Sequence, residues 1–395
     1  MKLKISGKKE KLSIRQLTEC ALFLYVYFMV FSYTEYGHDL NLQYPNFFQI
    51  IRFACYFLCV VRIFLKDSYK KESFIVAIIA IGLCVLCAVT NGENLIFFYM
   101  LFLLAVNGCD SERIIKVCLY AQGIVLFVTT CLSMCGFIDN ASVFTGGRLR
   151  QYLGFTWVTF APGLFFFICV EIIYLKKGLV SWKLYIPLIV YAIVLYIQTK
   201  TRMLFFMNVL VLTYFLVFGK KLVKTDQEKI FRMLVITPWI CAIISFVMVW
   251  LYGKGNRMMI SLDLVINRLG LAYNGIQKYG IHLFGQPISW IGNSLYNIAD
   301  WRYNYVDCSY VQTALNYGGL FLILVLMVYS IILYNSYTRG DFYLSIIIVF
   351  ILVLCITESR LFDLSFNPFI LLCSTKNFLN KKLEKIRNDE KQFCS

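Results

Sequence analysis

Ten basic residues lie in segments that the hydropathy and the charge distribution of this chain together place on the outer side of a membrane, and their types suit them to bind anions. Seven of the ten are arginines, whereas the segments on the opposite side are rich in lysine. A planar guanidinium binds a phosphate through two parallel hydrogen bonds, while a lysine ammonium acts as a hydrated point charge. The pattern indicates a site for a lipid phosphate or pyrophosphate. The ten residues are Arg148, Arg150, Lys200, Arg202, Lys254, Arg257, Arg268, Lys278, Arg302 and Arg360.

The stretch "TKTR" at residues 199–202 illustrates the alternative, because it interrupts an apolar run with two cations. Basic side chains at the ends of membrane spans can extend to the interface and contact lipid phosphates, which makes them anchors without any other role. The preference for arginine and the clustering of these residues favour a site. For any single residue, both interpretations stay open.

Several familiar kinds of active site are missing from the sequence. It contains no Asp-x-Asp pair that would hold a divalent metal against a nucleotide diphosphate, no Gly-rich phosphate loop, and only two histidines, His38 and His282. We therefore expect no metal, no cofactor and no nucleic acid partner. The 15 cysteines do not form a disulfide framework. We expect Cys308 to be exposed outside, and Cys131 and Cys135 to lie near the outer end of a span.

The composition defines the elements that must position the arginines. The chain has 395 residues, 60% of them hydrophobic and only 15% charged, with a mean hydropathy of +0.70. Its apolar runs are long enough to cross a bilayer as helices, so we expect an all-α polytopic integral membrane protein. The twelve predicted spans are 18–34, 47–65, 73–90, 94–108, 114–136, 156–175, 184–199, 202–219, 233–252, 316–334, 342–357 and 361–375.

The distribution of basic residues predicts the topology. With the N-terminus inside, the cytoplasmic segments hold 27 of the 38 Lys and Arg, the outer segments hold ten, and Arg52 falls within a span. This asymmetry follows the positive-inside rule and predicts both termini in the cytoplasm. The expected organisation is nine membrane helices with short loops over 1–252, a large extracytoplasmic loop over 253–315, three further membrane helices over 316–375, and a basic cytoplasmic tail over 376–395.

The large loop has two parts with different patterns. Residues 257–280 place polar side chains along one stripe and apolar side chains elsewhere, which predicts an amphipathic helix on the outer membrane surface or packed against the bundle. Residues 282–319 are dense in Trp, Tyr, Asn and Gly. Such aromatics are typical of an interfacial belt, and they also suit a carbohydrate site, where sugar faces stack on rings and hydroxyls pair with amides.

Five motifs, in this order and spacing, resemble a known family. They are "GGRLRQYLGFTW" (146–157), "TKTR" (199–202), an Arg-led amphipathic stretch running into "LFGQP" (283–287), "YVDCSYVQTALNYGGL" (305–320) and "ESRLFDLSFNPF" (358–369). Residues 140–375 resemble bacterial O-antigen and capsular polysaccharide polymerases of the Wzy type, which are related to the O-antigen ligases. The resemblance implies a GT-C-like membrane fold and a multi-pass protein of the bacterial cytoplasmic membrane.

The resemblance further implies a metal-independent glycosyltransferase. A glycan on undecaprenyl pyrophosphate would be transferred to another lipid-linked repeat unit, in contact with membrane lipids and with a chain-length regulator and a flippase as further partners. Arginines would hold the pyrophosphate. The arginines that fit this role are Arg148, Arg150, Arg202, Arg268 and Arg360. The related ligases carry a histidine where this chain has Asp307. We expect Asp307, Arg202 and Arg268 to be catalytic, and the expected substrate-binding residues are Arg148, Arg150, Lys200, Arg302, Tyr310, Glu358 and Arg360.

Such a transfer needs a group that takes the proton of the acceptor hydroxyl. Asp307 is the first candidate, with Glu358, Asp300 and Asp363 as reserves. Asp307 and Ser309 also precede an apolar run, so Asp307 could instead be a helix N-cap.

Other functions fit the same composition. A ligase-like transferase or a flippase of lipid-linked oligosaccharides would also have many spans and basic residues. Transporters tend to contain internal repeats and broken helices with buried charges, whereas this chain shows no clear repeat and few charges within its spans. A scaffold without activity would explain neither the outer arginines nor the aromatic loop.

Overall fold

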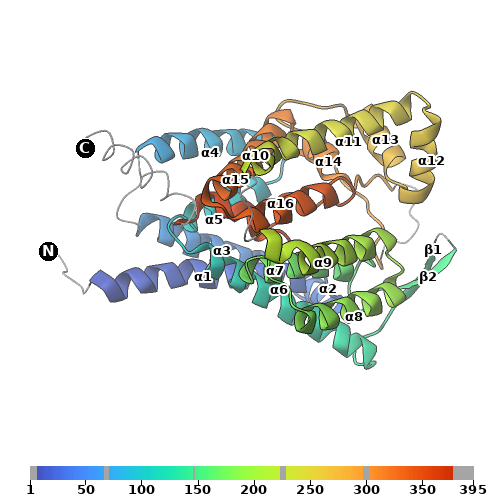
Figure 1. The fold of residues 1–395 in the computed structure, drawn as a ribbon, viewed down its shortest axis with the longest axis horizontal. Coiled ribbons are helices and arrows are strands. Elements are labelled where there is room, and N and C mark those ends of the chain that lie inside the picture. The colour runs from blue at the N-terminus through green and yellow to red at the C-terminus, as the bar shows by residue number, and fades with distance from the viewer. Residues whose placement is uncertain (1–6, 66–70, 146, 223–227, 297–302, 377–395) are drawn as a thin grey trace.

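The computed structural model describes residues 7–65, 71–145, 147–222, 228–296 and 303–376 of the chain. The protein is 72% helical, and the described residues form 16 α-helices, two short 3-10 helices and one two-stranded antiparallel sheet. Figure 1 shows the long helices running side by side as a bundle. The elements are α1 (Gly7–Phe31), α2 (Glu35–Gln43), α3 (Phe47–Phe64), α4 (Lys71–Asn91), α5 (Leu95–Ala105), α6 (Ser111–Met134), β1 (Ser142–Thr145), β2 (Arg148–Gln151), α7 (Phe160–Leu175), α8 (Trp182–Thr199), α9 (Arg202–Leu222), α10 (Glu228–Met233), η1 (Leu234–Ile236), α11 (Thr237–Gly253), α12 (Arg257–Ile266), α13 (Leu269–Tyr279), α14 (Ser309–Asn316), α15 (Gly319–Arg339), α16 (Phe342–Leu354) and η2 (Pro368–Ser374).

The helices have the length and the surface of a membrane protein. Among the described residues, six helical segments are long and apolar enough to cross a bilayer, and four shorter apolar helices accompany them. Large apolar side chains lie on the outside of the bundle, such as Phe57 at 66% exposure and Phe64 at 83%. A soluble protein rarely leaves so much apolar surface in water, whereas lipid tails would cover it. The expected all-α membrane protein is confirmed at this level.

Eleven of the twelve predicted spans coincide with helices, namely α1, α3 to α9, α11, α15 and α16. The helix α7 lies at the centre, because 14 of its 16 residues are buried. The remaining prediction, a span over 361–375, does not correspond to an α-helix. This segment contains only the 3-10 helix η2, and its residues Pro368 to Leu372 are buried among the other helices.

Side chains compensate for the missing helical hydrogen bonds in this irregular segment. Asn367 Nδ2 donates to the carbonyls of Arg360 (3.1 Å) and Leu361 (2.9 Å). Gln122 of α6 donates to the carbonyls of Ser365 and Phe366, each at 3.1 Å. Non-helical backbone is tolerated at membrane depth only where protein groups satisfy it in this way. Hydropathy cannot distinguish such a segment from a helix.

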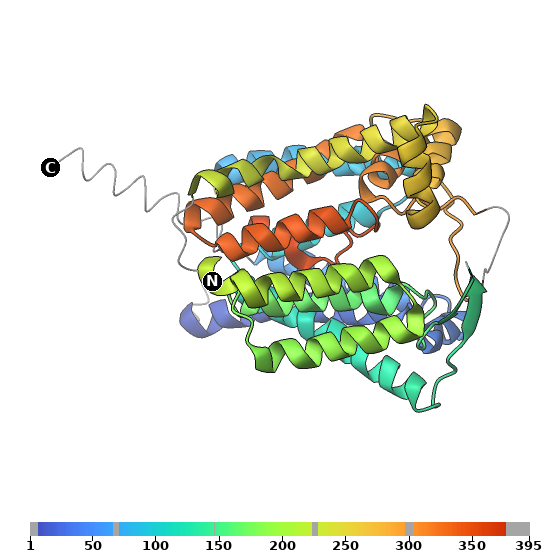
Figure 2. The same cartoon turned by 45° about the vertical axis from the view of Figure 1, so that its right-hand side comes forward.

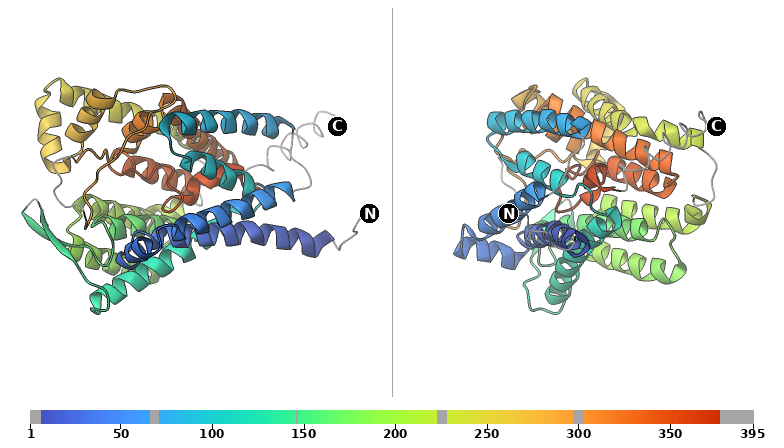
Figure 3. Two further views of the ribbon diagram at one scale, coloured as in Figure 1. Left: turned by 180° about the vertical axis from the view of Figure 1, so that it is seen from behind. Right: turned by 90° about the vertical axis from the view of Figure 1, so that its left-hand side faces the viewer.

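The two ends of the bundle are clearly different. At one end, Thr18 of α1 donates to the carbonyl of Ala105 (3.3 Å), and the N–H of Lys376 donates to the carbonyl of Cys109 (2.9 Å). The other end carries the β1–β2 hairpin together with α12 and α13, as Figures 1 and 2 show and the view from behind in Figure 3 repeats. We call it the hairpin end, meaning the end that contains residues 142–151 and 257–279.

The single amphipathic helix expected over 257–280 is wrong. The chain forms two helices there, because Asn267 adopts a left-handed conformation with φ of 53° and ends α12. A short polar residue such as Asn tolerates this region better than most residues do. The helix α13 then starts in a new direction, with Arg268 as its N-cap residue.

Candidate functional site

One guanidinium at the hairpin end lies between two carboxylates. Arg268 Nη2 donates to Glu358 Oε1 at 2.9 Å, and Arg268 Nε forms an ion pair with Asp307 Oδ2 at 3.4 Å. The three side chains are only 15%, 13% and 23% exposed, respectively. Solvent therefore screens these charges weakly.

The environment alters the acidity of both carboxyl groups. Burial raises the pKa of Asp307, and the nearby Arg268 and Arg360 oppose this rise. Burial likewise raises the pKa of Glu358, with Arg268 opposing the rise and Asp307 adding to it. Two acids that share one cation repel each other, so one of them can hold a proton at a higher pH than usual. A carboxylate with a raised pKa is a suitable general base near neutral pH.

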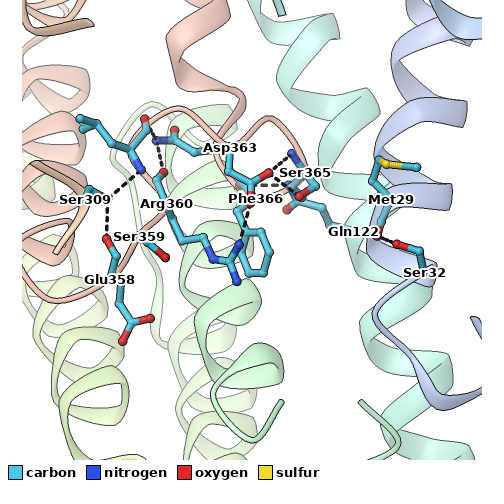
Figure 4. A network of polar contacts seen from close by, with 12 residues as sticks. Met29, Ser32, Gln122, Ser309, Glu358, Ser359, Arg360, Asp363, Ser365 and Phe366 are labelled. Atoms are coloured by element: carbon cyan, nitrogen blue, oxygen red, sulfur yellow. Dashed lines mark hydrogen bonds and ion pairs between the residues drawn. The ribbon is translucent and has the colours of Figure 1, made fainter. Parts of the chain in front are cut away.

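Local structure explains how the two acids reach Arg268. Asp307 lies just before α14, whose N-cap residue is Cys308. The alternative that Asp307 is the N-cap is therefore wrong, because its carboxylate pairs with Arg268 instead. Glu358 follows α16, and the hydroxyl of Ser309 donates to the Glu358 carbonyl at 2.5 Å. The same hydroxyl accepts the N–H of Leu361 at 3.1 Å, which holds the 358–361 turn against α14 (Figure 4).

Arg360 is fully engaged within its own segment. Its Nη1 contacts Asp363 Oδ2 at 2.7 Å, and its guanidinium carbon lies 3.9 Å from the centre of the Phe366 ring (Figure 4). The other oxygen of Asp363 accepts the N–H and the hydroxyl of Ser365. A cation that already has a carboxylate and an aromatic face has little free capacity for another anion. Arg360 thus stabilises the irregular segment that carries Glu358.

The hairpin arginines are held by the "TKTR" turn. Arg148 and Arg150 are two positions apart on β2, so their side chains point to the same side of the strand. Arg148 Nη1 donates to the carbonyl of Lys200 and Arg150 Nε to that of Thr199, both at 3.0 Å. Lys200 has a left-handed backbone with φ of 53° at the end of α8. The turn therefore contributes its backbone carbonyls, which orient two guanidinium groups from a distant part of the chain.

Arg148 and Arg150, which we call the hairpin pair, differ from Arg268 and Arg360 because no nearby carboxylate of the described residues pairs with them. Within the described ranges, no acidic side chain forms an ion pair with Arg148 or Arg150. Burial lowers the pKa of Arg150, and repulsion from Arg148 and Arg268 adds to this effect. An anion bound beside the two guanidinium groups would relieve the repulsion. Arg148 and Arg150 thus combine partial burial with the absence of an ion pair among the described residues.

The other predicted site residues have different surroundings. Arg202 begins α9 and is exposed, and no hydrogen bond or ion pair joins its side chain to another residue of the described ranges. Tyr310 has no exposed surface, and its hydroxyl donates to the Leu352 carbonyl at 2.8 Å, so it packs α14 on α16 and does not line the site. Lys200 is half-buried. Arg302 and Asp300 lie outside the described residues.

Aromatic residues of the long loop border the acid pair. Tyr305 shares a hydrogen bond of 2.6 Å with the hydroxyl of Ser359, which lies between Glu358 and Arg360. The Trp290 ring is half-buried, and its centre lies 6.0 Å from the Tyr305 ring and 6.0 Å from the Tyr279 ring. The motif "YVDCSY" contained the signal for Tyr305, but its partner Ser359 depends on the fold. The arrangement fits a sugar ring beside the acids.

Cys308 differs from its expected exposure. Its side chain is buried, at 5% exposure, whereas Cys131 and Cys135 near the end of α6 are exposed.

No group of three or more His, Cys, Asp or Glu among the described residues could hold a metal ion. No family model, curated protein or solved structure matches this chain. Any function of the chain must therefore be inferred from its own residues.

Proposed function

We propose that the protein is an oligosaccharide repeat-unit polymerase that acts on lipid-pyrophosphate-linked glycans. The observation that carries this proposal is an acid pair on Arg268 near two hairpin arginines that form no ion pair within the described residues. The two groups are close enough for Arg150 to interact electrostatically with both Arg268 and Glu358. The acid pair suits the removal of a proton from a hydroxyl, and the hairpin arginines suit the stabilisation of an anionic leaving group. A transfer between two lipid-linked glycans needs both.

The chemistry follows from these two groups. Arg148 and Arg150 would bind the pyrophosphate of the donor, here undecaprenyl pyrophosphate, and stabilise the negative charge that grows on it. The acceptor hydroxyl oxygen bonds to the anomeric carbon of the donor sugar while the bond from that carbon to the pyrophosphate oxygen breaks. Asp307 takes the hydroxyl proton, and the polyprenyl pyrophosphate leaves. Trp290 and Tyr305 would position the acceptor sugar for this attack.

The proposal also assigns a place in the cell. Twelve crossings, eleven as helices and one as the buried irregular segment, would leave both termini in the cytoplasm and the hairpin end on the outer face of the bacterial cytoplasmic membrane. Lipid-linked repeat units would come from a flippase, and a chain-length regulator would act beside the hairpin end. A GT-C-like architecture is part of the same proposal.

Cysteine labelling tests this topology. In a variant that keeps only Cys135, a membrane-impermeant maleimide should label intact cells, because the thiol is exposed at the hairpin end of α6. A variant whose single cysteine replaces Lys176 should be labelled only after lysis, because this exposed residue ends α7 at the opposite end of the bundle. A variant that keeps only Cys308 should react only after denaturation. Labelling of the Lys176→Cys variant but not of Cys135 in intact cells would invert the topology.

Reconstitution tests the reaction itself. Purified protein in lipid nanodiscs, given only undecaprenyl-pyrophosphate-linked repeat units, should produce a ladder of longer lipid-linked glycans without added metal or nucleotide sugar. Mass spectrometry should show one polyprenyl pyrophosphate released for each bond formed. Transfer to a different acceptor lipid alone would indicate a ligase, and movement of unchanged repeat units across a vesicle membrane would indicate a flippase. Either result would overturn the proposal.

Substitution of a hairpin arginine tests the anion position. Arg150→Lys keeps the positive charge but loses the planar fork, so we expect activity in the nanodisc reaction to fall about tenfold to hundredfold, as for one lost charge-assisted hydrogen bond. Arg257→Ala is the matched control, because Arg257 is an exposed cation at the same end. It should retain full activity. Equal losses from both variants would mean that the outer cations act only as a general positive surface.

A further inference from the structure

Four consecutive amide groups converge on a single residue beside the acid pair. The N–H of Asn267 donates to the Asp263 carbonyl at 2.6 Å. The N–H groups of Arg268 and Leu269 both donate to Asp263 Oδ1 at 2.7 Å, and that of Gly270 donates to Asp263 Oδ2 at 3.0 Å. Both carboxylate oxygens are therefore occupied by the first turn of α13. Carboxylates that accept several backbone N–H bonds are among the strongest local constraints on a chain.

The constraint acts directly on the arginine of the site. Arg268 is the N-cap residue of α13, and its backbone N–H is one of the groups that Asp263 binds. Its side chain must then span from this fixed backbone to Glu358 and Asp307, whose contacts lie at 2.9 and 3.4 Å. A small rotation of the first turn of α13 would move the guanidinium away from one acid or from both.

Packing leaves little room for an alternative arrangement. A side chain at Gly270 would place its first carbon 2.9 Å from the Tyr252 hydroxyl and 3.0 Å from Asp263 Oδ2. The helix α13 therefore approaches the end of α11 closely at this point. Asn267 provides the left-handed turn that brings α13 back over the last turn of α12. Asp263, Asn267 and Gly270 together define one backbone geometry.

We propose that Asp263 is a positioning residue, which fixes the backbone of Arg268 so that one guanidinium contacts Asp307 and Glu358 together. The catalytic consequence depends on the proposed function, whereas the structural constraint does not. Asp263 contacts no substrate in this scheme and acts only through Arg268. Its loss should therefore change the acid pair and not the hairpin arginines.

The expected change has a definite sign. Arg268 opposes the rise in the pKa of both acids that burial causes, so a displaced Arg268 would let both pKa values rise further. Other groups that act on the acid pair or on Arg268 are Arg360, Arg150, Tyr303 and Cys308, and within the described residues no hydrogen bond or ion pair joins any of them to Asp263. Because the base must be ionised, the acidic limb of the pH–activity profile should move to higher pH, by up to about one unit.

The test compares Asp263→Ala with Asn256→Ala in full-length protein in nanodiscs. Asn256 caps α12 through the N–H groups of Met258 and Met259, at 3.0 and 3.3 Å, so it is a matched cap that does not touch Arg268. Hydrogen exchange of the amides at 268–270 should become at least about tenfold faster in Asp263→Ala and should not change in Asn256→Ala. Only Asp263→Ala should also move the acidic limb of the pH–activity profile. Asp263→Asn keeps one acceptor oxygen, so both effects should be smaller in this variant than in Asp263→Ala.

The possible results distinguish the structural constraint on Arg268 from its catalytic consequence. Faster exchange with an unmoved acidic limb would show that Asp263 only caps a helix, and unchanged exchange would overturn the constraint itself. Equal shifts of the limb in Asp263→Ala and Asn256→Ala would assign the effect to general loosening of the loop. Failure of the wild-type protein to form polymer would overturn the proposed function, while the exchange measurements would still decide whether Asp263 holds the Arg268 backbone.

Discussion

Replacing Arg268 by alanine should reduce polymer formation by at least about a hundredfold, because the same change removes the counter-ion of two acids. Asp307 and Glu358 would then lose their shared ion-pair partner in a partly buried site, and their pKa values would rise above the already raised ones, with only the weaker influence of Arg360 opposing the rise in both. The raised pKa values would leave a smaller fraction of either acid ionised, so less of the protein could accept a proton from the acceptor hydroxyl. The measurement is the rate of ladder formation in nanodiscs at pH 7.

The control must separate lost chemistry from lost stability. Removing one partner of a fully buried ion pair costs about 3–5 kcal/mol, and the cost should be smaller here because the three side chains keep 13% to 23% exposure. Arg339→Ala breaks a comparable pair with Asp341, at 3.3 Å and with 18% and 28% exposure, outside the site. We expect a similar change in thermal stability from both variants and normal turnover per folded molecule from Arg339→Ala alone. Equal turnover in both variants would remove Arg268 from the catalytic scheme.

The predicted spans coincide with helices where an apolar run has few other ways to satisfy its backbone. An apolar run in lipid satisfies its backbone most simply as a helix, which is why hydropathy located eleven of the helices. Among the described residues, six helical segments are also long and apolar enough to cross a bilayer. The 361–375 segment escapes this rule because Asn367, Gln122 and Tyr329 provide hydrogen bonds to its carbonyls. Gln122 lies more than 240 positions from its partners, so no local pattern could reveal the contact.

The helix break at Asn267 has a similar cause. A hydrophobic stripe continues through residues 257–280, and nothing in its period requires an interruption. The break depends on the carboxylate of Asp263, which binds the amides of the next helix after the chain has turned. Capping of this kind is visible in a sequence only when the helix end is already known.

The candidate site residues were chosen by residue type, and their pairing could not be predicted. Arginine in place of lysine indicated anion binding, and Asp307 and Glu358 were both candidates for the base. The sequence could not show that both acids meet at Arg268, since Glu358 is 90 positions away from it. It also could not show that Thr199 and Lys200 orient the hairpin arginines, 49 and 52 positions away. Tyr310 lies in a matching motif, yet it is fully buried, because a tyrosine suits a core as well as a surface.

The two acids of the pair should differ in their roles. Glu358 accepts a hydrogen bond of 2.9 Å from Arg268, whereas Asp307 is held only by the longer contact of 3.4 Å and is the more exposed of the two. The less tightly held carboxylate is the better base, because less interaction energy is lost when it takes a proton. We therefore expect Asp307→Asn to lower turnover by about 10²–10⁴-fold. Cells should accumulate single lipid-linked repeat units, visible as a change from a ladder to one band.

Glu358→Gln is the matched variant and should have a different signature. Without the second acid, Arg268 would neutralise Asp307 alone, and the pKa of Asp307, which burial raises, should fall back toward its ordinary value. Activity requires ionised Asp307 and is lost as the pH falls through its pKa, so the acidic limb should move to lower pH while turnover at neutral pH falls only about tenfold. Protein abundance should stay normal in both variants, because each amide is nearly isosteric with its acid. A normal ladder from Asp307→Asn together with a lost ladder from Glu358→Gln would reverse the roles, and normal ladders from both would exclude the acid pair as the source of the base.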